Sequence, residues 1–232
     1  MCYNQKSKTL ARRTTVQILL HLTAYFILSS PVLCDDVTHL EVAAGQNPND
    51  LSIRTKLVKC YSLLRYTSAE AEENNRKHIL WIIKNHPEAE VAGLPECCFE
   101  PSLDQKGFDE AKQLWLNQTK QNPTNTTILG HAAQFFFVHD NDIAEYLLKR
   151  AKAIKPNNPK WYDELGNLYM PVGGEDEVSA KKAMKEFETA ESFDTSDSGK
   201  FYRLSVLSDA AIEAGEITNA AKYAKSLLEA AP

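Results

Sequence analysis

The segment from 161 to 190 contains an ordered series of small and large residues that limits the folds open to this chain. The first group is a leucine–glycine pair and a tyrosine, and the second group, after a glycine-rich turn, is a phenylalanine with one alanine before it and one after it. In chain order these residues are Leu165, Gly166, Tyr169, Ala183, Phe187 and Ala190. This order is typical of two antiparallel helices that need a tiny side chain where they cross. One such pair cannot bury its apolar faces alone, so the pattern predicts stacked pairs.

Flanking segments repeat parts of the pattern in register. Three repeats are predicted, over 125–158, 159–200 and 201–232, and together they fill 124–232. Their predicted packing positions also include Phe135, Ala144, Gly215 and Ala220. The region 51–123 is predicted to be a degenerate helical-repeat region with helices over 51–64, 69–84 and 108–120. Glycines and prolines predict a long loop at 88–107, and we expect a polar loop at 35–50.

These residues resemble the tetratricopeptide-repeat (TPR) family, whose 34-residue unit carries Trp-x2-Leu-Gly-x2-Tyr, then Ala-x3-Phe, an Ala and a Pro. The unit at 159–194 matches best, although Tyr162 replaces the tryptophan and Asp194 stands where the proline belongs. The resemblance implies an all-α fold, a right-handed α-solenoid of antiparallel helix pairs. It also implies that the first helices line a concave groove that binds a protein or peptide partner, and it implies no catalysis.

The groove positions that correspond to this family are Leu129, Phe136, Phe137, Lys160, Asp163, Asn167, Tyr202 and Asp209. Some family members hold a partner's carboxylate end with Lys, Asn and Arg; here only Asn167 fits such a set, and Asp163 and Asp209 would repel a carboxylate. We expect a groove that is apolar near Phe136 and Phe137 and acidic toward the C-terminus, suited to a segment with basic residues. The alternative is that 135–137 belong to the core between repeats.

Residues 1–34 have the composition of a signal peptide. A basic start precedes an apolar run from Val16 to Leu28, which is short for a membrane span of roughly 20 residues. We expect a secreted or periplasmic protein that contacts membrane only through this segment if it is uncleaved. The alternative is a mildly hydrophobic N-terminal helix. Since the segment carries four basic residues and no acid, its removal changes the net charge from −5 to −9. An acidic surface disfavours nucleic-acid binding.

Few residues of this sequence indicate catalysis, metal binding or a disulfide. The six histidines lack metal-ligand spacing, and no cofactor is expected. In an exported protein, Cys60 is expected to form a disulfide with Cys97 or Cys98. The alternative to a non-catalytic scaffold is an accessory or catalytic subunit of an envelope enzyme with its site near the 88–107 loop, His78 and His86. No acid–base spacing supports it.

The last predicted repeat keeps an apolar face. Ile217, Ala221 and Leu228 fall on one side of its second helix. Terminal repeats normally carry a polar outer face for solubility. We therefore expect self-association or further repeats at the C-terminal end.

Overall fold

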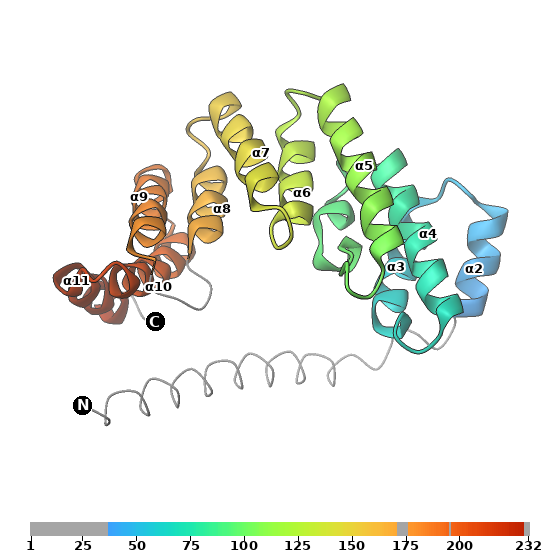
Figure 1. Ribbon diagram of the computed structural model, residues 1–232, viewed down its shortest axis with the longest axis horizontal. Coiled ribbons are helices and arrows are strands. Elements are labelled where there is room, and N and C mark those ends of the chain that lie inside the picture. The colour runs from blue at the N-terminus through green and yellow to red at the C-terminus, as the bar shows by residue number, and fades with distance from the viewer. Residues whose placement is uncertain (1–36, 171–175, 195, 230–232) are drawn as a thin grey trace.

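The computed structural model describes residues 37–170, 176–194 and 196–229, and all regular elements in these ranges are helical (Figure 1). The predicted all-α class is confirmed for this part of the chain. No described helix is long and apolar enough to cross a membrane. The predicted signal peptide, 1–34, lies outside the described residues. The helices are α2 (Val37–Gln46), α3 (Leu51–Leu64), α4 (Ala69–Asn85), η1 (Glu90–Gly93), η2 (Pro95–Cys97), α5 (Gln105–Gln121), α6 (Thr126–Phe136), α7 (Asn141–Ile154), α8 (Pro159–Tyr169), α9 (Glu177–Phe193), α10 (Asp197–Glu213) and α11 (Ile217–Glu229).

Each helix packs against its neighbours in chain order, so that the helices form a curved row from α2 to α11 (Figure 1). Short polar side chains fix where the helices begin. Asp50, Ser68 and Asn125 accept hydrogen bonds from backbone N–H groups in the first turns of α3, α4 and α6. Such caps satisfy donors that have no partner within the helix. They explain why the predicted starts at 51 and 69 agree with the structure.

Glycines allow the closest approach between helices in the C-terminal half. A Cβ atom added to Gly166 of α8 would lie 2.6 Å from Cε1 of Phe187 on α9. A Cβ atom added to Gly130 of α6 would likewise lie 2.9 Å from Cζ3 of Trp161 on α8. Gly215 has a φ of 70° at the turn between α10 and α11, a conformation that glycine adopts without steric cost.

The predicted packing positions lie in or beside the core except Gly215, which is exposed at the turn between α10 and α11. Phe135, Ala144, Leu165, Gly166, Ala183, Phe187, Ala190 and Ala220 are buried. Tyr169 is half-buried, and its hydroxyl donates a hydrogen bond to Glu145 on α7 at 2.6 Å. The structure thus places these residues at contacts within and between helix pairs.

The structure differs from the prediction at 35–50, where α2 replaces the expected polar loop. Contacts with distant residues hold this helix. Tyr61 of α3 and His78 of α4 both hydrogen-bond Oε1 of Glu41, at 2.9 and 2.8 Å, and Ala44 joins a small cluster with Leu57. These contacts are long-range, so the local sequence of α2 does not reveal them.

The segment expected to be a long loop contains η1 and η2 and ends where α5 begins at Gln105. It packs against α3, α4 and α6, so it takes the position that the first helix of a pair would occupy before α5 (Figure 1). Pro87, Pro95 and Pro101 fall within or beside this segment. Prolines lack the N–H that a helix interior requires, which explains why the segment forms short 3-10 turns rather than an α-helix.

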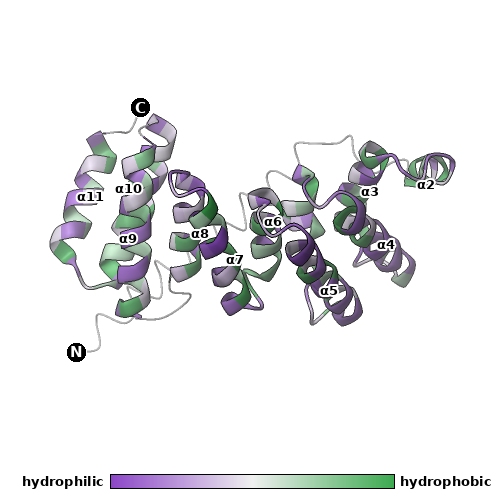
Figure 2. Cartoon of the chain, turned by 90° about the horizontal axis from the view of Figure 1, so that it is seen from above, coloured by the Kyte–Doolittle hydropathy of each residue, from purple (hydrophilic) through white to green (hydrophobic). Residues whose placement is uncertain are grey.

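Apolar residues gather in three clusters along the row. The largest extends from α3 to α8, a second joins α9 to α11, and a small third joins α2 to α3 and α4. The boundary between the first two lies between α8 and α9. Seen from above, hydrophilic residues dominate the visible faces of α4 and α5 (Figure 2).

Candidate functional site

The predicted apolar end of the groove lies in the core. Leu129 and Phe136 of α6 are fully buried, and Phe135 stacks on Phe108 of α5 at 5.2 Å. Only Phe137, just past the end of α6, is half-buried. The prediction that Leu129 and Phe136 line an open groove is therefore wrong, and the alternative of a core position, which was offered for 135–137, is correct for Phe136. Both side chains pack against neighbouring helices, which a sequence pattern alone does not distinguish from a groove.

Some of the predicted residues of α8 and α10 come together, namely Asn167 with Tyr202, and Asp163 with α10 through Arg203. The hydroxyl of Tyr202 donates a hydrogen bond to Oδ1 of Asn167 at 2.8 Å. The guanidinium of Arg203 holds both carboxylate oxygens of Asp163, each at 2.9 Å. The first helices of two successive pairs are therefore joined by a polar contact surface. We call Lys160, Asp163, Glu164, Asn167, Tyr202 and Asp209 the α8–α10 face.

Arg203 was not predicted as a site residue, although its guanidinium decides the charge of this face. Its side chain is 3% exposed and also contacts Oδ2 of Asp194 at 2.9 Å and Oε2 of Glu191 at 3.6 Å. Hydrogen bonds from Ser196 and from Arg203 lower the pKa of Asp194 to about 2. The hydrogen bonds that Arg203 donates to Asp163 and Asp194 raise the pKa of its guanidinium. Asp163 is thus neutralised inside the fold, contrary to the expectation that it repels a ligand's carboxylate.

Two other acids on this face, Glu164 and Asp209, form no salt bridge with any described residue. Burial raises the pKa of Glu164, with Lys160 opposing and Asp163 adding to the shift. Burial and the nearby charge of Glu213 raise the pKa of Asp209. Lys160 is exposed and lies over the ring of Trp161, with its Nζ 5.2 Å from the ring centroid. The face therefore keeps an acidic character that does not depend on Asp163.

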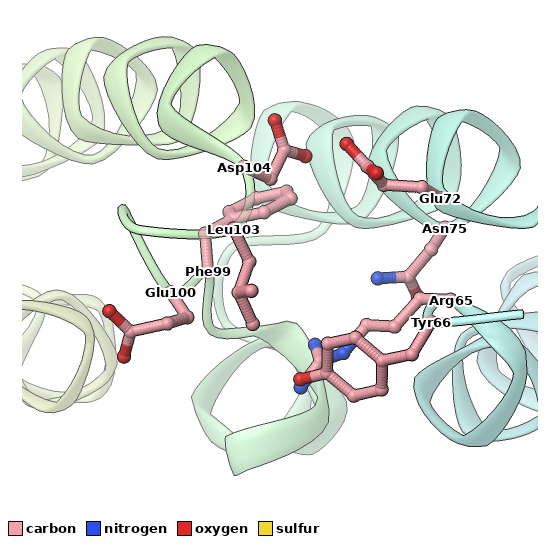
Figure 3. A pocket seen from close by; sticks show the side chains of 8 residues that line it. All are labelled: Arg65, Tyr66, Glu72, Asn75, Phe99, Glu100, Leu103 and Asp104. Atoms are coloured by element: carbon pink, nitrogen blue, oxygen red, sulfur yellow. The ribbon is translucent and has the colours of Figure 1, made fainter. Parts of the chain in front are cut away.

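A recessed pocket lies at the other end of the row, between the end of α3, α4 and the segment that leads into α5 (Figure 3). Its volume is about 30 Å³. Phe99 is buried in it, whereas Tyr66 and Leu103 are exposed. Arg65 and Asn75 supply polar groups. Four of its residues lie in the 88–107 segment, near which the alternative enzyme site was expected, but none was predicted individually, because the lining comes from three elements.

An open groove also runs between α4 and α5. Its volume is about 510 Å³, and Leu80, Trp81 and Leu114 supply its apolar surface. Lys84 of α4 and Glu110 of α5 are among its polar residues. The ring of Trp81 also carries the guanidinium of Arg54, 4.1 Å from its centroid, so this tryptophan contributes to packing as well as to the groove.

The cysteines do not form the predicted disulfide, because Cys97 and Cys98 are both free thiols. Burial raises the pKa of Cys97, and burial raises the pKa of Cys98 to about 11 in spite of the nearby Arg65. Since the thiolate is the reactive form, both groups are poor nucleophiles at neutral pH.

The two histidines near the 88–107 segment do not converge on these thiols in the described structure. His78 is fully buried against Glu41 and Arg54, and the ring of His86 lies tilted against that of Trp81. Within the described ranges, no group of three or more His, Cys, Asp or Glu side chains could hold a metal ion. The alternative of an enzyme site near this segment stays a prediction.

The comparisons with known proteins identify no relative. No family model matches this chain, and no curated protein matches its sequence. The resemblance to tetratricopeptide repeats therefore stays a prediction that depends on the residues quoted above and on the helix pairing.

Proposed function

We propose that this chain is a non-catalytic helical-repeat scaffold of the tetratricopeptide type that binds a protein or peptide segment bearing basic residues. The α8–α10 face is the proposed binding surface. Its Tyr202 and Asn167 offer hydrogen-bonding groups, and Glu164 and Asp209 supply negative charge. The observation that carries the proposal is that these acids lie on the first helices of adjacent pairs and form no salt bridge in the described part of the chain.

The physical basis is electrostatic complementarity. Partly buried carboxylates whose pKa is raised are stabilised by an approaching cation, because the cation favours their charged form. A lysine or arginine in a bound segment meets that need, and the exposed Tyr202 ring adds contact area. We also propose that the protein acts outside the cytoplasm, on the basis of the composition of 1–34.

The test is selection of random displayed peptides on the immobilised full chain. We expect the selected peptides to be enriched in lysine and arginine. The double variant Glu164→Lys and Asp209→Lys should bind them about tenfold more weakly, since each rim charge contributes on the order of 0.5–1 kcal/mol.

The matched control carries Glu73→Lys and Asp109→Lys, which make the same change in net charge on α4 and α5. This control should retain binding. The proposal fails if no peptide is enriched, or if both double variants lose the same affinity.

A further inference from the structure

The open groove between α4 and α5 lies between two hydrogen-bonded contacts of these helices. Near the start of α5, Nε of Arg76 donates to Oδ2 of Asp104 at 2.8 Å. Near the end of α4, Nε2 of Gln118 donates to the backbone carbonyls of Ile83 and Lys84 at 3.1 and 2.9 Å. The two helices therefore lie side by side and run in the same direction along the groove (Figure 1).

The floor of the groove is apolar and is held in place by the core. Leu80, Trp81 and Leu114 are half-buried, and all three pack against the largest apolar cluster. The ring of Trp81 also contacts the guanidinium of Arg54, and its centroid lies 5.1 Å from that of the His86 ring. Side chains that are already packed lose little conformational freedom when a partner covers them. The groove of about 510 Å³ therefore has a preformed apolar floor.

The two ends of the groove carry opposite charges. Asp109 lies toward the start of α5, where it accepts a hydrogen bond from Gln105 at 3.0 Å and forms no salt bridge with any described residue. Glu110 is its neighbour, and Nζ of Lys106 lies 3.9 Å away from Glu110. Lys84 lies toward the other end, and it also forms no salt bridge in the described chain. A complementary partner carries positive charge at the first end and negative charge at the second.

The backbone of the occupant must satisfy its own hydrogen bonds. Both walls are α-helices, whose backbone N–H and C=O groups bond within the helix. An extended segment on the apolar floor would lose water from its own backbone groups without gaining new partners. A helix pairs these groups internally and presents side chains alone to the floor. The groove therefore favours a helical occupant.

The helix dipole and the charges of the groove favour the same orientation of that helix. Acidic residues stabilise the first turn of a helix, and basic residues stabilise its last turn. A helix that lies antiparallel to α4 and α5 has its first turn beside Lys84 and its last turn beside Asp109 and Glu110. The antiparallel orientation also opposes its dipole to those of both walls.

We propose that the groove between α4 and α5 binds an amphipathic helix of a partner protein, antiparallel to both walls. Apolar residues of the partner at i, i+4 and i+7 cover Leu80, Trp81 and Leu114. Its acidic first turn meets Lys84, and its basic last turn meets Asp109. This surface is separate from the α8–α10 face, so the chain has a second binding surface with a different class of ligand.

The test uses labelled peptides of about 15 residues, whose binding to the full chain is followed by fluorescence anisotropy. The charged peptide is a stapled helix with leucine at i, i+4 and i+7, glutamates in its first turn and lysines in its last. The neutral peptide has glutamine at all the charged positions, and the proline peptide lacks the staple and has a central proline. We expect the charged peptide to bind with a Kd on the order of 100 µM, about fivefold more tightly than the neutral peptide and at least about tenfold more tightly than the proline peptide.

Two variants locate the site without removing a core residue. Gln113→Trp places a ring in the groove from an exposed position and should weaken the charged peptide at least about fivefold. Lys84→Glu should weaken the charged peptide about threefold and leave the neutral peptide unchanged. The matched control, Lys185→Glu, makes the same charge change at an exposed site on α9 and should leave both affinities unchanged.

A nitroxide label on the first turn of the charged peptide tests the orientation by NMR. It should broaden the amide signals around Lys84 more than those around Asp109, because the antiparallel helix begins at the Lys84 end. Stronger broadening around Asp109 would overturn the proposed orientation.

Four other results would overturn the inference. The proline peptide could bind as tightly as the charged peptide, which would mean an extended ligand. The charged and neutral peptides could bind equally, or Gln113→Trp could keep full affinity, which would place binding elsewhere. Sedimentation could show a dimer of the chain that Gln113→Trp dissociates, which would mean that a second copy covers the groove.

The inference and the proposed function fail independently. The double variant Glu164→Lys and Asp209→Lys should keep its affinity for the charged peptide, because both substitutions lie outside the groove. Gln113→Trp should likewise keep its affinity for the lysine- and arginine-rich peptides selected on the α8–α10 face. Loss of one interaction therefore leaves the other measurable.

Discussion

The two halves of the row are joined by different chemistry. From α6 to α11, the helices approach through small residues beside aromatic rings, as Gly166 does with Phe187 and Gly130 with Trp161. From α2 to α4, a buried polar group adds to the apolar contacts: Arg54 and Glu41 hold the two ring nitrogens of His78 at 3.0 and 2.8 Å. A close apolar crossing needs particular residues at fixed spacing, whereas a polar junction needs only compatible partners far apart in the chain.

Arg203 is the exception in the C-terminal half, and its replacement tests the comparison most severely. Arg203→Met leaves Asp163 and Asp194 facing each other without their shared cation. Because the carboxylates are partly exposed, we expect a loss of about 2–3 kcal/mol in the free energy of unfolding, at the low end for a buried ion pair. Urea denaturation measures it. A loss below about 0.5 kcal/mol, the range of ordinary surface substitutions, would mean that apolar contacts alone hold this half.

The glycine crossing gives the next largest effect. In Gly166→Val, the added carbon atoms would overlap the ring of Phe187, which is fully buried and has little room to move. We expect a loss of about 2 kcal/mol in the free energy of unfolding, as in other overpacked cores. The double variant with Phe187→Leu should recover part of it. A single variant as stable as the original chain would contradict the crossing geometry.

Lowering the pH should destabilise the N-terminal half of the row by weakening the contacts that hold α2. Burial lowers the pKa of His78 below 6.5, although Glu41 opposes the shift. Burial alone would raise the pKa of Glu41, but hydrogen bonds from His78 and Tyr61 and the charge of Lys77 bring it below 4.5. Both groups bind protons more weakly in the folded state, so their stabilising effect is present above these unfolded values and is lost as pH falls.

The hydrogen bonds of His78 also predict that stability falls as the pH falls. Arg54 donates a hydrogen bond to Nδ1 of His78 only while that nitrogen carries no proton. Protonation of Nδ1 would place its N–H against the N–H of Arg54 and break this hydrogen bond. We expect the amides of α2 to lose protection from hydrogen exchange as pH falls below about 6.5, once the intrinsic pH dependence of exchange is removed. His78→Gln should make this loss less dependent on pH. Unchanged protection of α2 down to pH 5 would rule out the effect.

The smallest effect has the opposite sign. Gly45 of α2 has open space around it, since a Cβ atom there would meet nothing within 4 Å. Gly45→Ala should therefore stabilise α2 by about 0.5–1 kcal/mol, because alanine loses less conformational freedom in a helix. Hydrogen exchange of α2 measures it. A less stable α2 in this variant would contradict the prediction and show that Gly45 has a packing role.

The sequence predicted what local pattern can encode. The order of Leu165, Gly166 and Phe187 indicated the pair formed by α8 and α9, and proline or capping residues indicated the ends of α3 and α4. It did not predict α2, because the turn-forming run from Gly45 to Asp50 dominates that segment. The contacts that hold α2, at Tyr61 and His78, lie 20 and 37 residues away from Glu41.

The candidate sites were harder to predict for a related reason. Leu129 and Phe136 have the residue types of an apolar groove, and only the packed neighbours of α6 show that they are covered. Arg203 is one basic residue in a mixed helix, and its three carboxylate partners come from α8, α9 and the turn before α10. Such convergence of distant residues is a property of the fold rather than of any motif.

The split between the two large clusters has a mechanical consequence. Between α8 and α9 no single cluster of buried side chains continues along the row, and the ring of Phe187 seated on Gly166 spans that gap. α8 and α9 also share the most extensive contact of any neighbouring helix pair in the described chain, so this glycine crossing, rather than one continuous apolar cluster, carries the curvature of the row from one half to the other.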